Sequence, residues 1–234
     1  MRTTKSTWER TSFLGGEKEQ YGMSILIALP KGRIADKMLP MLANTPLALD
    51  AKAMKSRVLR IPTATPGVEA LLLKGADLPR YVAGGVAALG IVGSDTLDEC
   101  EVDLLELADL KLGACRLSLC GPEETSLELL RRKPHLRIAT KYVRMTRAWL
   151  RAKELTAELV PLQSSVELAP ILGLADAIVD LVETGGTLRA HGLREIEVIG
   201  RTSARLVASR GAYLSEPDRI APLARLMIAA LGGS

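Results

Sequence analysis

The sequence predicts an α/β protein with two lobes and a ligand cleft between them. From Ile25 onward, short apolar runs alternate with helical patterns, which is typical of a mostly parallel sheet covered by helices on both faces. Two extended segments, 111–120 and 200–212, join the halves of the chain without a proper loop. If both are strands that cross between the lobes, the first lobe is discontinuous and includes the C-terminal helix.

The first lobe begins with a strand and an amphipathic helix. Residues 25–29 are all apolar, which favours a buried strand. A helix over 33–44 follows, because apolar residues recur there at helical spacing, and Pro46 helps to end it. The next expected elements are strands over 58–61 and 68–73, a helix that begins at Leu78, and a strand over 88–92.

The second half of the chain repeats the alternation. The expected elements are an extended segment over 112–119, a helix over 127–132, a strand over 136–140, a helix over 143–153, a strand over 158–162, a short helix over 166–172, strands over 177–182 and 205–208, and a closing helix over 220–231. We therefore expect a flexible tail over 1–22, a first lobe over 23–108 and 208–234, and a second lobe over 109–207.

The composition excludes several classes of protein. Seven residues in 234 are aromatic, so a platform that stacks the bases of single-stranded nucleic acid is not expected. The net charge of +4 suits anionic small molecules and falls short of a nucleic-acid footprint. Three cysteines without paired spacing predict neither a disulfide framework nor a zinc site, which fits the cytoplasm. The most apolar stretch, 81–93, is shorter than the roughly 18 residues of a membrane helix.

The turn after the strand 177–182 is the strongest local signal. It consists of Thr184, Gly185, Gly186, Thr187 and Leu188, with Asp180 and Glu183 just before it. Such a turn aims backbone N–H groups, two hydroxyls and the positive end of a helix at one spot, so it predicts a phosphate cradle. The two carboxylates can bind sugar hydroxyls, either directly or when a hydroxyl is bound to a metal ion. The alternative is a tight turn in which Thr184 or Thr187 is the N-cap.

Other polar residues follow the remaining strands, where ligands of open α/β sheets collect. Lys31 and Arg33 can neutralise a leaving pyrophosphate. The alternative is a solvated helix start, although cations at the N-terminus of a helix are disfavoured by the helix dipole. Arg57 is a further cation beside the next strand. Asp77 is placed to accept a hydrogen bond from a ligand amino group or to cap a helix. The ring of Tyr142, which follows the strand 136–140, can lie against a purine. The alternative is that this ring packs in the core.

These features together resemble ATP phosphoribosyltransferase in its short form, the family that opens histidine biosynthesis. The signature is carried by Glu167, Gly173, Ala175, Ile178, Asp180, Leu181, Thr184, Gly185, Thr187, Leu188 and the run 189–193. The segments ALPKGRI, GADLPRYV, LGIVGSD, DLKLGACRL and RIATKY stand in the order of the family's blocks. Ser94 and His191 depart from the residues usual in the family, which are Lys and Asn.

The resemblance implies a two-lobed fold like that of the type II periplasmic binding proteins and a Mg²⁺-dependent transfer. N1 of ATP attacks the anomeric carbon of phosphoribosyl pyrophosphate, and pyrophosphate leaves. The implied roles are catalysis beside the pyrophosphate for Arg33 and Arg57, binding of the nucleotide for Lys31, Asp77 and Tyr142, and binding of phosphoribosyl pyrophosphate for Asp180, Glu183, Thr184, Gly185, Gly186, Thr187 and Leu188. We expect no direct protein ligand for Mg²⁺, which the substrates hold.

The resemblance also implies a partner. Short-form members rely on a separate regulatory subunit that resembles histidyl-tRNA synthetase, and the chain stops soon after 231, so we expect a hetero-oligomer built on a dimer of this chain. The competing hypothesis is a non-catalytic solute-binding module of the same fold. Neither a nucleic acid nor a membrane is expected as a partner.

Overall fold

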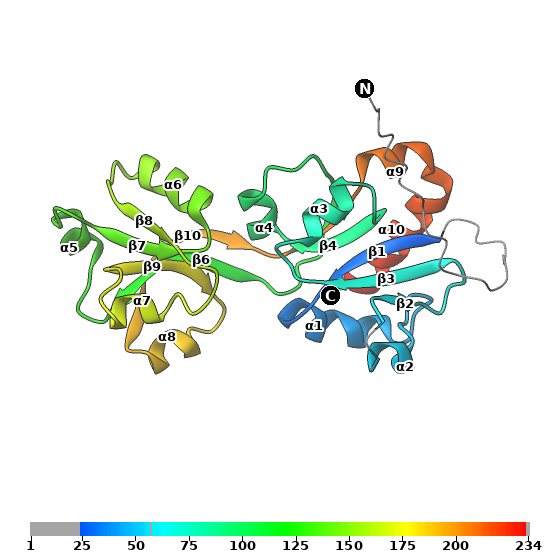
Figure 1. The fold of residues 1–234 in the computed structure, drawn as a ribbon, viewed down its shortest axis with the longest axis horizontal. Coiled ribbons are helices and arrows are strands. Elements are labelled where there is room, and N and C mark those ends of the chain that lie inside the picture. The colour runs from blue at the N-terminus through cyan, green and yellow to red at the C-terminus, as the bar shows by residue number, and fades with distance from the viewer. Residues whose placement is uncertain (1–23, 57, 233–234) are drawn as a thin grey trace, which may run out of the picture.

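The computed structural model describes residues 24–56 and 58–232, so the expected tail and Arg57 lie outside the described residues. The chain forms two β-sheets with helices on their faces, and the sheets lie end to end along the longest axis of the molecule (Figure 1). The first sheet has the strand order β2-β3-β1-β4-β11-β5, and the second has the order β10-β6-β9-β7-β8.

The first sheet is built from both ends of the described chain. Its strands are β1 (Ile25–Pro30), β2 (Arg60–Pro62), β3 (Val68–Leu73), β4 (Leu89–Gly93), β5 (Leu105–Asp109) and β11 (Ala204–Ala208). The helices beside it are α1 (Arg33–Leu42), α2 (Ala51–Met54), α3 (Leu78–Ala83), α4 (Ser94–Glu99), α9 (Arg210–Ser215) and α10 (Pro217–Leu231).

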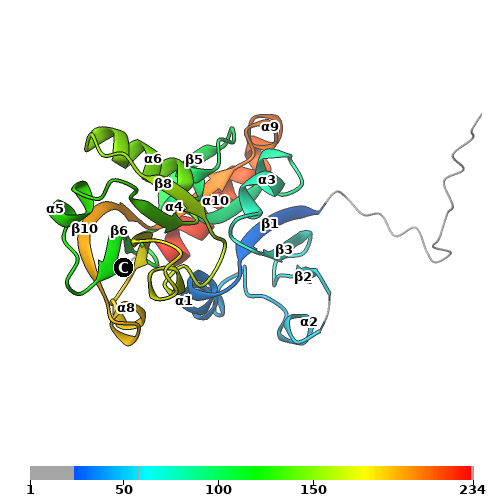
Figure 2. The ribbon, with the colours of Figure 1, turned by 60° about the vertical axis from the view of Figure 1, so that its left-hand side comes forward.

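Two apolar clusters hold these helices to the first sheet. Met38 of α1 and Met227 of α10 are fully buried against one face, in a cluster with Ile27 and Ile91. The other face packs against α3 through a separate cluster. Helices α3 and α1 accordingly lie on opposite sides of β1 in both views (Figure 1, Figure 2). Burial of apolar side chains on both faces leaves the ends of the strands as the place for polar chemistry.

The second sheet is formed by the middle of the chain. Its strands are β6 (Cys115–Pro122), β7 (Arg137–Thr140), β8 (Glu158–Pro161), β9 (Ala177–Val182) and β10 (Leu193–Thr202). Its helices are α5 (Leu127–Arg131), α6 (Val143–Ala152), α7 (Leu168–Ile171) and α8 (Gly186–Ala190). One cluster packs under α5 and α6, and another packs under α7 and α8.

The expectation of a mostly parallel sheet is wrong. Strand β1 pairs in parallel with β3 and β4, and β7 pairs in parallel with β8 and β9. The other pairings within the two sheets are antiparallel. The reason is the path of the chain: β11 returns from the second sheet and inserts between β4 and β5, so it runs against both neighbours.

The crossings between the sheets are shorter than the sequence predicts. Residues 111–114 form a turn with left-handed backbone at Lys111 and Gly113, and β6 starts only at Cys115. The segment expected to be extended over 200–212 is divided between β10, β11 and the first turn of α9, with Ser203 between the two strands. Elements β5, α2, α4 and α9 and most of β10 were not expected.

The packing between β4 and α3 can be tested by a substitution of Gly90. A Cβ atom at Gly90 would lie 2.7 Å from Cγ2 of Val82 and 2.9 Å from Cδ2 of Leu78. We predict that Gly90→Ala lowers the free energy of unfolding by about 1–3 kcal/mol, because both neighbours are buried and cannot move freely. Urea unfolding monitored by circular dichroism measures the change. Gly211→Ala is the matched control, since a Cβ there meets nothing within 4 Å and no loss of stability is expected. Equal stability of the Gly90 variant and the control would contradict the packing argument.

Candidate functional site

The carboxyl ends of the parallel strands of the first sheet gather polar residues at one edge. Arg33 begins α1 after β1, Asp77 precedes α3 after β3, and Asp95 lies in α4 after β4. Because β1 is hydrogen-bonded to both β3 and β4 in parallel, these three strand ends are neighbours. This edge therefore brings Arg33 together with two carboxylates on adjacent loops and helix starts.

The second sheet presents a matching edge that faces the first. Tyr142 follows β7, and Glu183 follows the parallel strand β9. Glu183 Oε2 accepts a hydrogen bond from Arg33 Nη1 at 2.9 Å, and the Tyr142 hydroxyl donates to Asp95 Oδ2 at 3.0 Å. One contact thus joins the end of β9 to α1, and the other joins the end of β7 to α4. The cleft between the lobes lies between these two contacts.

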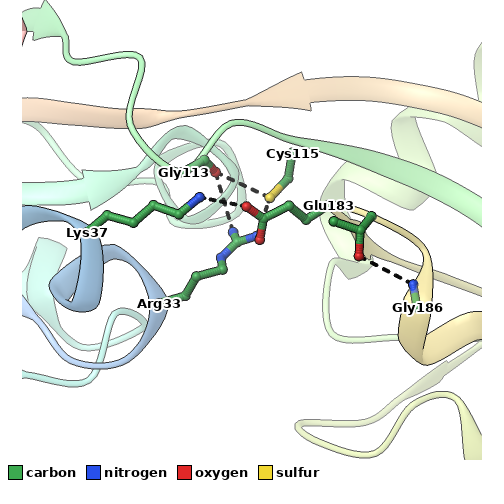
Figure 3. A network of polar contacts seen from close by, with 7 residues as sticks. Arg33, Lys37, Gly113, Cys115, Glu183 and Gly186 are labelled. Atoms are coloured by element: carbon green, nitrogen blue, oxygen red, sulfur yellow. Dashed lines mark hydrogen bonds and ion pairs between the residues drawn. The ribbon is translucent and has the colours of Figure 1, made fainter. Parts of the chain in front are cut away.

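The contact at Glu183 is a small network of charges (Figure 3). Lys37 Nζ donates to Glu183 Oε1 at 2.6 Å, while Arg33 also contacts the Cys115 thiol and lies 3.5 Å from the carbonyl oxygen of Gly113. The hydrogen bond from Lys37, followed by that from Arg33, holds the pKa of Glu183 below its ordinary value. Burial opposes the charge of Arg33, but its bonds to Cys115 and Glu183 outweigh burial and raise its pKa. Glu183 and Arg33 therefore stay ionised at neutral pH.

The loop after β9 has the backbone that its sequence predicts. Gly185 is the N-cap of α8 with a left-handed φ of 73°, a conformation that glycine adopts at little cost. The alternative in which Thr184 or Thr187 is the N-cap is wrong. Instead, Thr184 Oγ1 accepts a long bond of 3.4 Å from the Gly186 N–H, and Thr187 lies inside the helix.

A cavity of about 290 Å³ lies at this loop. It is lined by Arg33 and by residues 180–188, so the loop and a cation of the other lobe share it. Arg189, which was not singled out from the sequence, donates to the Thr184 carbonyl oxygen at 3.2 Å and adds positive charge behind the loop. Backbone N–H groups of a helix start together with nearby cations make this cavity suitable for a phosphate group.

Asp180 lines the same cavity without an ion-pair partner among the described residues. Its Oδ1 accepts a hydrogen bond from the Leu181 N–H at 2.8 Å. Burial raises the pKa of Asp180, the hydrogen bond from Leu181 and the charge of Lys141 oppose that rise, and the nearby carboxylates Glu167 and Asp95 add to it. A carboxyl group that lines a cavity, and whose ionised form is disfavoured by burial, is typical of a group that binds a ligand.

Tyr142 is 3% exposed and packs in the core of the second sheet. Burial, followed by the charge of Asp95, raises the pKa of Tyr142, so the hydroxyl stays protonated and donates. The second Asp95 oxygen accepts a bond of 2.9 Å from Thr202 Oγ1, which in turn accepts from Ser94 Oγ at 3.0 Å. Asp95 was not selected from the sequence, although it stands two residues after the fully buried strand β4.

The remaining expected site residues lie apart from this network. Lys31 and Asp77 are exposed at the edge of the first sheet. Asp77 occupies the N-cap position of α3, but its side chain forms no capping hydrogen bond in the described chain. Arg57 lies outside the described residues. The structure thus joins Arg33, Asp180, Glu183 and the loop 184–188 into one cavity, and the expected nucleotide residues Lys31, Asp77 and Tyr142 do not belong to its lining.

Two broader features bear on the type of protein. Over residues 24–56 and 58–232, no group of three or more His, Cys, Asp and Glu side chains is arranged to hold a metal ion. In the same part of the chain, every helix is too short or too polar to cross a membrane.

Comparison with known proteins gives one consistent result. The family model described as ATP phosphoribosyltransferase matches residues 74–229. The ATP phosphoribosyltransferase of Deinococcus deserti is 45% identical over 199 residues, which cover 85% of this chain and 89% of that protein. The enzyme of the same name from Paramagnetospirillum magneticum is 40% identical over 215 residues, or 89% of this chain and 97% of that protein.

Solved structures agree on the fold. The ATP phosphoribosyl transferase (HisG:HisZ) complex from Thermotoga maritima contains a chain with a TM-score of 0.76 and 27% identity, covering 90% of this chain and all of that one. The alkanesulfonate-binding protein SsuA from Xanthomonas axonopodis has a TM-score of 0.55 and 16% identity, covering 89% and 73%. This second likeness concerns the fold alone, and it confirms the expected two-lobed fold of the type II periplasmic binding proteins.

Asp180 gives a test of stability against pH. Because burial raises its pKa above the ordinary value of 3.8, the ionised carboxylate costs stability, and that cost grows as the pH rises through the folded-state pKa. We predict that Asp180→Asn has a higher free energy of unfolding than the unaltered chain at neutral pH. The difference should shrink as the pH falls below 3.8, where both folded and unfolded carboxyls are protonated. Urea unfolding over a pH series measures it.

Asp176→Asn is the matched control, with the opposite sign. Burial opposes the charge of Asp176, but hydrogen bonds from Lys133 and the Arg137 N–H outweigh burial and lower its pKa. Asp176→Asn should therefore destabilise the chain at neutral pH, and its effect should fade as the pH drops through the lowered pKa. If Asp180→Asn lowered the free energy of unfolding at neutral pH as much as Asp176→Asn does, the argument that burial of the ionised Asp180 carboxylate costs stability would be contradicted.

Proposed function

The chain belongs to the ATP phosphoribosyltransferase family, and from that premise we propose how its cleft carries out the transfer. The enzyme is a pentosyltransferase that joins ATP to phosphoribosyl pyrophosphate, releases pyrophosphate and so takes the first step of histidine biosynthesis. The observation that carries the proposal is the cavity that is lined by the loop 184–188, by Asp180 and by Arg33 of the opposite lobe.

The order of charges across this cavity suits one molecule of phosphoribosyl pyrophosphate. The loop 184–188 binds the 5-phosphate through backbone N–H groups and hydroxyls. Asp180 and Glu183 accept hydrogen bonds from the ribose hydroxyls. Arg33 meets the pyrophosphate and stabilises the negative charge that develops as the bond to the anomeric carbon breaks, and we propose the same role for Arg57 from the sequence alone. No nucleophile of the protein is required, because N1 of ATP attacks directly.

The nucleotide approaches from the edge of the first sheet. Lys31 and Asp77 are exposed there, so a cation can contact the triphosphate and a carboxylate can accept a hydrogen bond from the adenine amino group. Tyr142 is the third proposed nucleotide residue, although it is 3% exposed and packs in the core of the second sheet. Holding two polyanions in one orientation supplies much of the rate enhancement.

Mg²⁺ fits this site as a companion of the substrate. A resident ion would need several protein ligands, and within the described residues no cluster of three such groups is present. Mg²⁺ is usually held by substrate phosphates with one or two carboxylates, and Asp180 supplies an unpaired carboxylate in the cavity. When bound, the ion neutralises part of the charge of the pyrophosphate.

We also propose that the chain works in the cytoplasm with a second subunit. The solved relative from Thermotoga maritima is a HisG:HisZ complex, in which the HisG-type chain is matched over its whole length. By analogy, this chain would form a hetero-oligomer with a regulatory subunit that resembles histidyl-tRNA synthetase, built on a dimer of catalytic subunits.

The reaction is tested by measuring pyrophosphate release. We expect release only when ATP, phosphoribosyl pyrophosphate and Mg²⁺ are all present, and faster release when the partner subunit is added. Mass spectrometry of the nucleotide product identifies phosphoribosyl-ATP. If neither the chain alone nor the chain with its partner releases pyrophosphate, the enzymatic function is wrong.

Arg33 is tested separately from substrate binding. We predict that Arg33→Ala slows the chemical step by roughly 100-fold, because the charge that Arg33 meets develops in the transition state. The affinity for ATP should change much less. Single-turnover kinetics isolate the chemical step, and Arg80→Ala, which removes an exposed arginine of α3, is the matched control. An unchanged single-turnover rate for Arg33→Ala would exclude its catalytic role.

A further inference from the structure

We propose that Lys37 is a second cationic ligand of the pyrophosphate group, and that the Glu183 carboxylate occupies the place of that group in the ligand-free chain. The proposal rests on the proposed function of the cavity, and it adds a residue that lies outside the sequence motif of the first strand and helix.

The geometry places Lys37 beside Arg33. The two residues are four positions apart in α1, so their side chains lie on the same face of the helix, one turn from each other. Both reach across the cleft to the same carboxylate, Arg33 Nη1 to one oxygen at 2.9 Å and Lys37 Nζ to the other at 2.6 Å (Figure 3). The two cations therefore already converge on a single anionic group.

The charges of this region call for an anion larger than one carboxylate. Arg33 and Lys37 carry two positive charges against the single negative charge of Glu183. They stand in the first two turns of a ten-residue helix, where the positive helix end disfavours cations. Asp36 lies in the same turn, but within the described chain it is exposed and forms no ion pair with either cation. A doubly or triply charged pyrophosphate balances these charges better than Glu183 does.

The exchange of Glu183 for pyrophosphate is physically easy. The side chains are accessible, with exposed fractions of 38% for Arg33, 44% for Lys37 and 34% for Glu183. Ion pairs between such exposed groups contribute little stability, so their replacement by a multivalent anion with several acceptor oxygens is favourable. Once released, Glu183 remains with Asp180 in the lining of the cavity, where both can meet the ribose hydroxyls of the substrate.

The first experiment uses inorganic pyrophosphate as the probe and isothermal titration calorimetry of the ligand-free chain at constant ionic strength. Loss of one charge-assisted contact predicts that Lys37→Ala weakens pyrophosphate binding roughly 10-fold. Lys37→Arg should restore most of the affinity, because it restores the charge. Glu183→Gln should strengthen binding, because the competing carboxylate is gone. Lys52→Ala, which removes an exposed lysine of α2, is the matched control and should leave the affinity unchanged.

The outcomes separate the proposal from its alternatives. Equal affinity of Lys37→Ala and the control, or no binding of pyrophosphate by the unaltered chain, would overturn it. Weaker binding by Glu183→Gln would overturn the role of Glu183 as the resident anion. Thermal unfolding of each variant, measured alongside, excludes a loss of folded protein as the cause.

Steady-state kinetics of the complete enzyme provide a second readout. Lys37→Ala should raise the KM for phosphoribosyl pyrophosphate and leave the KM for ATP unchanged, whereas a purely structural role would move neither selectively. Failure of the proposed function is distinguishable, because it would abolish pyrophosphate release by the unaltered enzyme and leave the calorimetric comparison intact.

Discussion

A buried carboxylate fixes how the two lobes meet. Asp95 is 9% exposed, and a polar group at that depth is tolerated only when hydrogen bonds replace those it would make with water. Its two oxygens are satisfied by the hydroxyl of Tyr142, from the second lobe, and by that of Thr202, at the end of a strand that crosses between the lobes. Moving either lobe would leave Asp95 unsatisfied, so the relative position of the strand ends depends on this residue.

Helix α4, which carries Asp95, makes a second contact between the lobes. The backbone N–H groups of Arg144 and Met145, at the start of α6, donate to the Glu99 carboxylate of α4 at 2.9 Å and 3.2 Å. Helix α4 therefore joins the lobes through one buried and one helix-capping contact, whereas α1 joins them through exposed ion pairs to Glu183. Because exposed pairs are the weaker kind, we infer that the cleft opens on the side of α1 and pivots near α4.

The apolar runs and strand ends of this sequence predicted much of the fold, and long-range pairing accounts for what they missed. Strand β9 was predicted at its observed bounds, because six residues with few charges leave little choice. Most of β10 was missed since register shifts after Glu195 and Val198 break its alternation of apolar and polar residues. Strand direction has no local signature, so the antiparallel place of β11 was invisible. In the site, Arg33 and Glu183 stood out beside strands, but Lys37 and Asp95 acquire meaning only through partners 146 and 47 positions away.

In the proposed binding mode, the carboxylates of Asp180 and Glu183 orient the substrate. A cavity with cations at both ends would accept phosphoribosyl pyrophosphate in either direction, since both of its ends are anionic. Glu183 stands directly before the loop 184–188 and pairs with the cations of α1, and Asp180 lines the same cavity. Their negative charge repels phosphate and accepts hydrogen bonds from neutral hydroxyls. The loop offers neutral N–H groups and α1 offers full charges, so the end with more negative charge is drawn to α1. That asymmetry places the bond to be broken beside Arg33, where stabilising the departing group lowers the barrier.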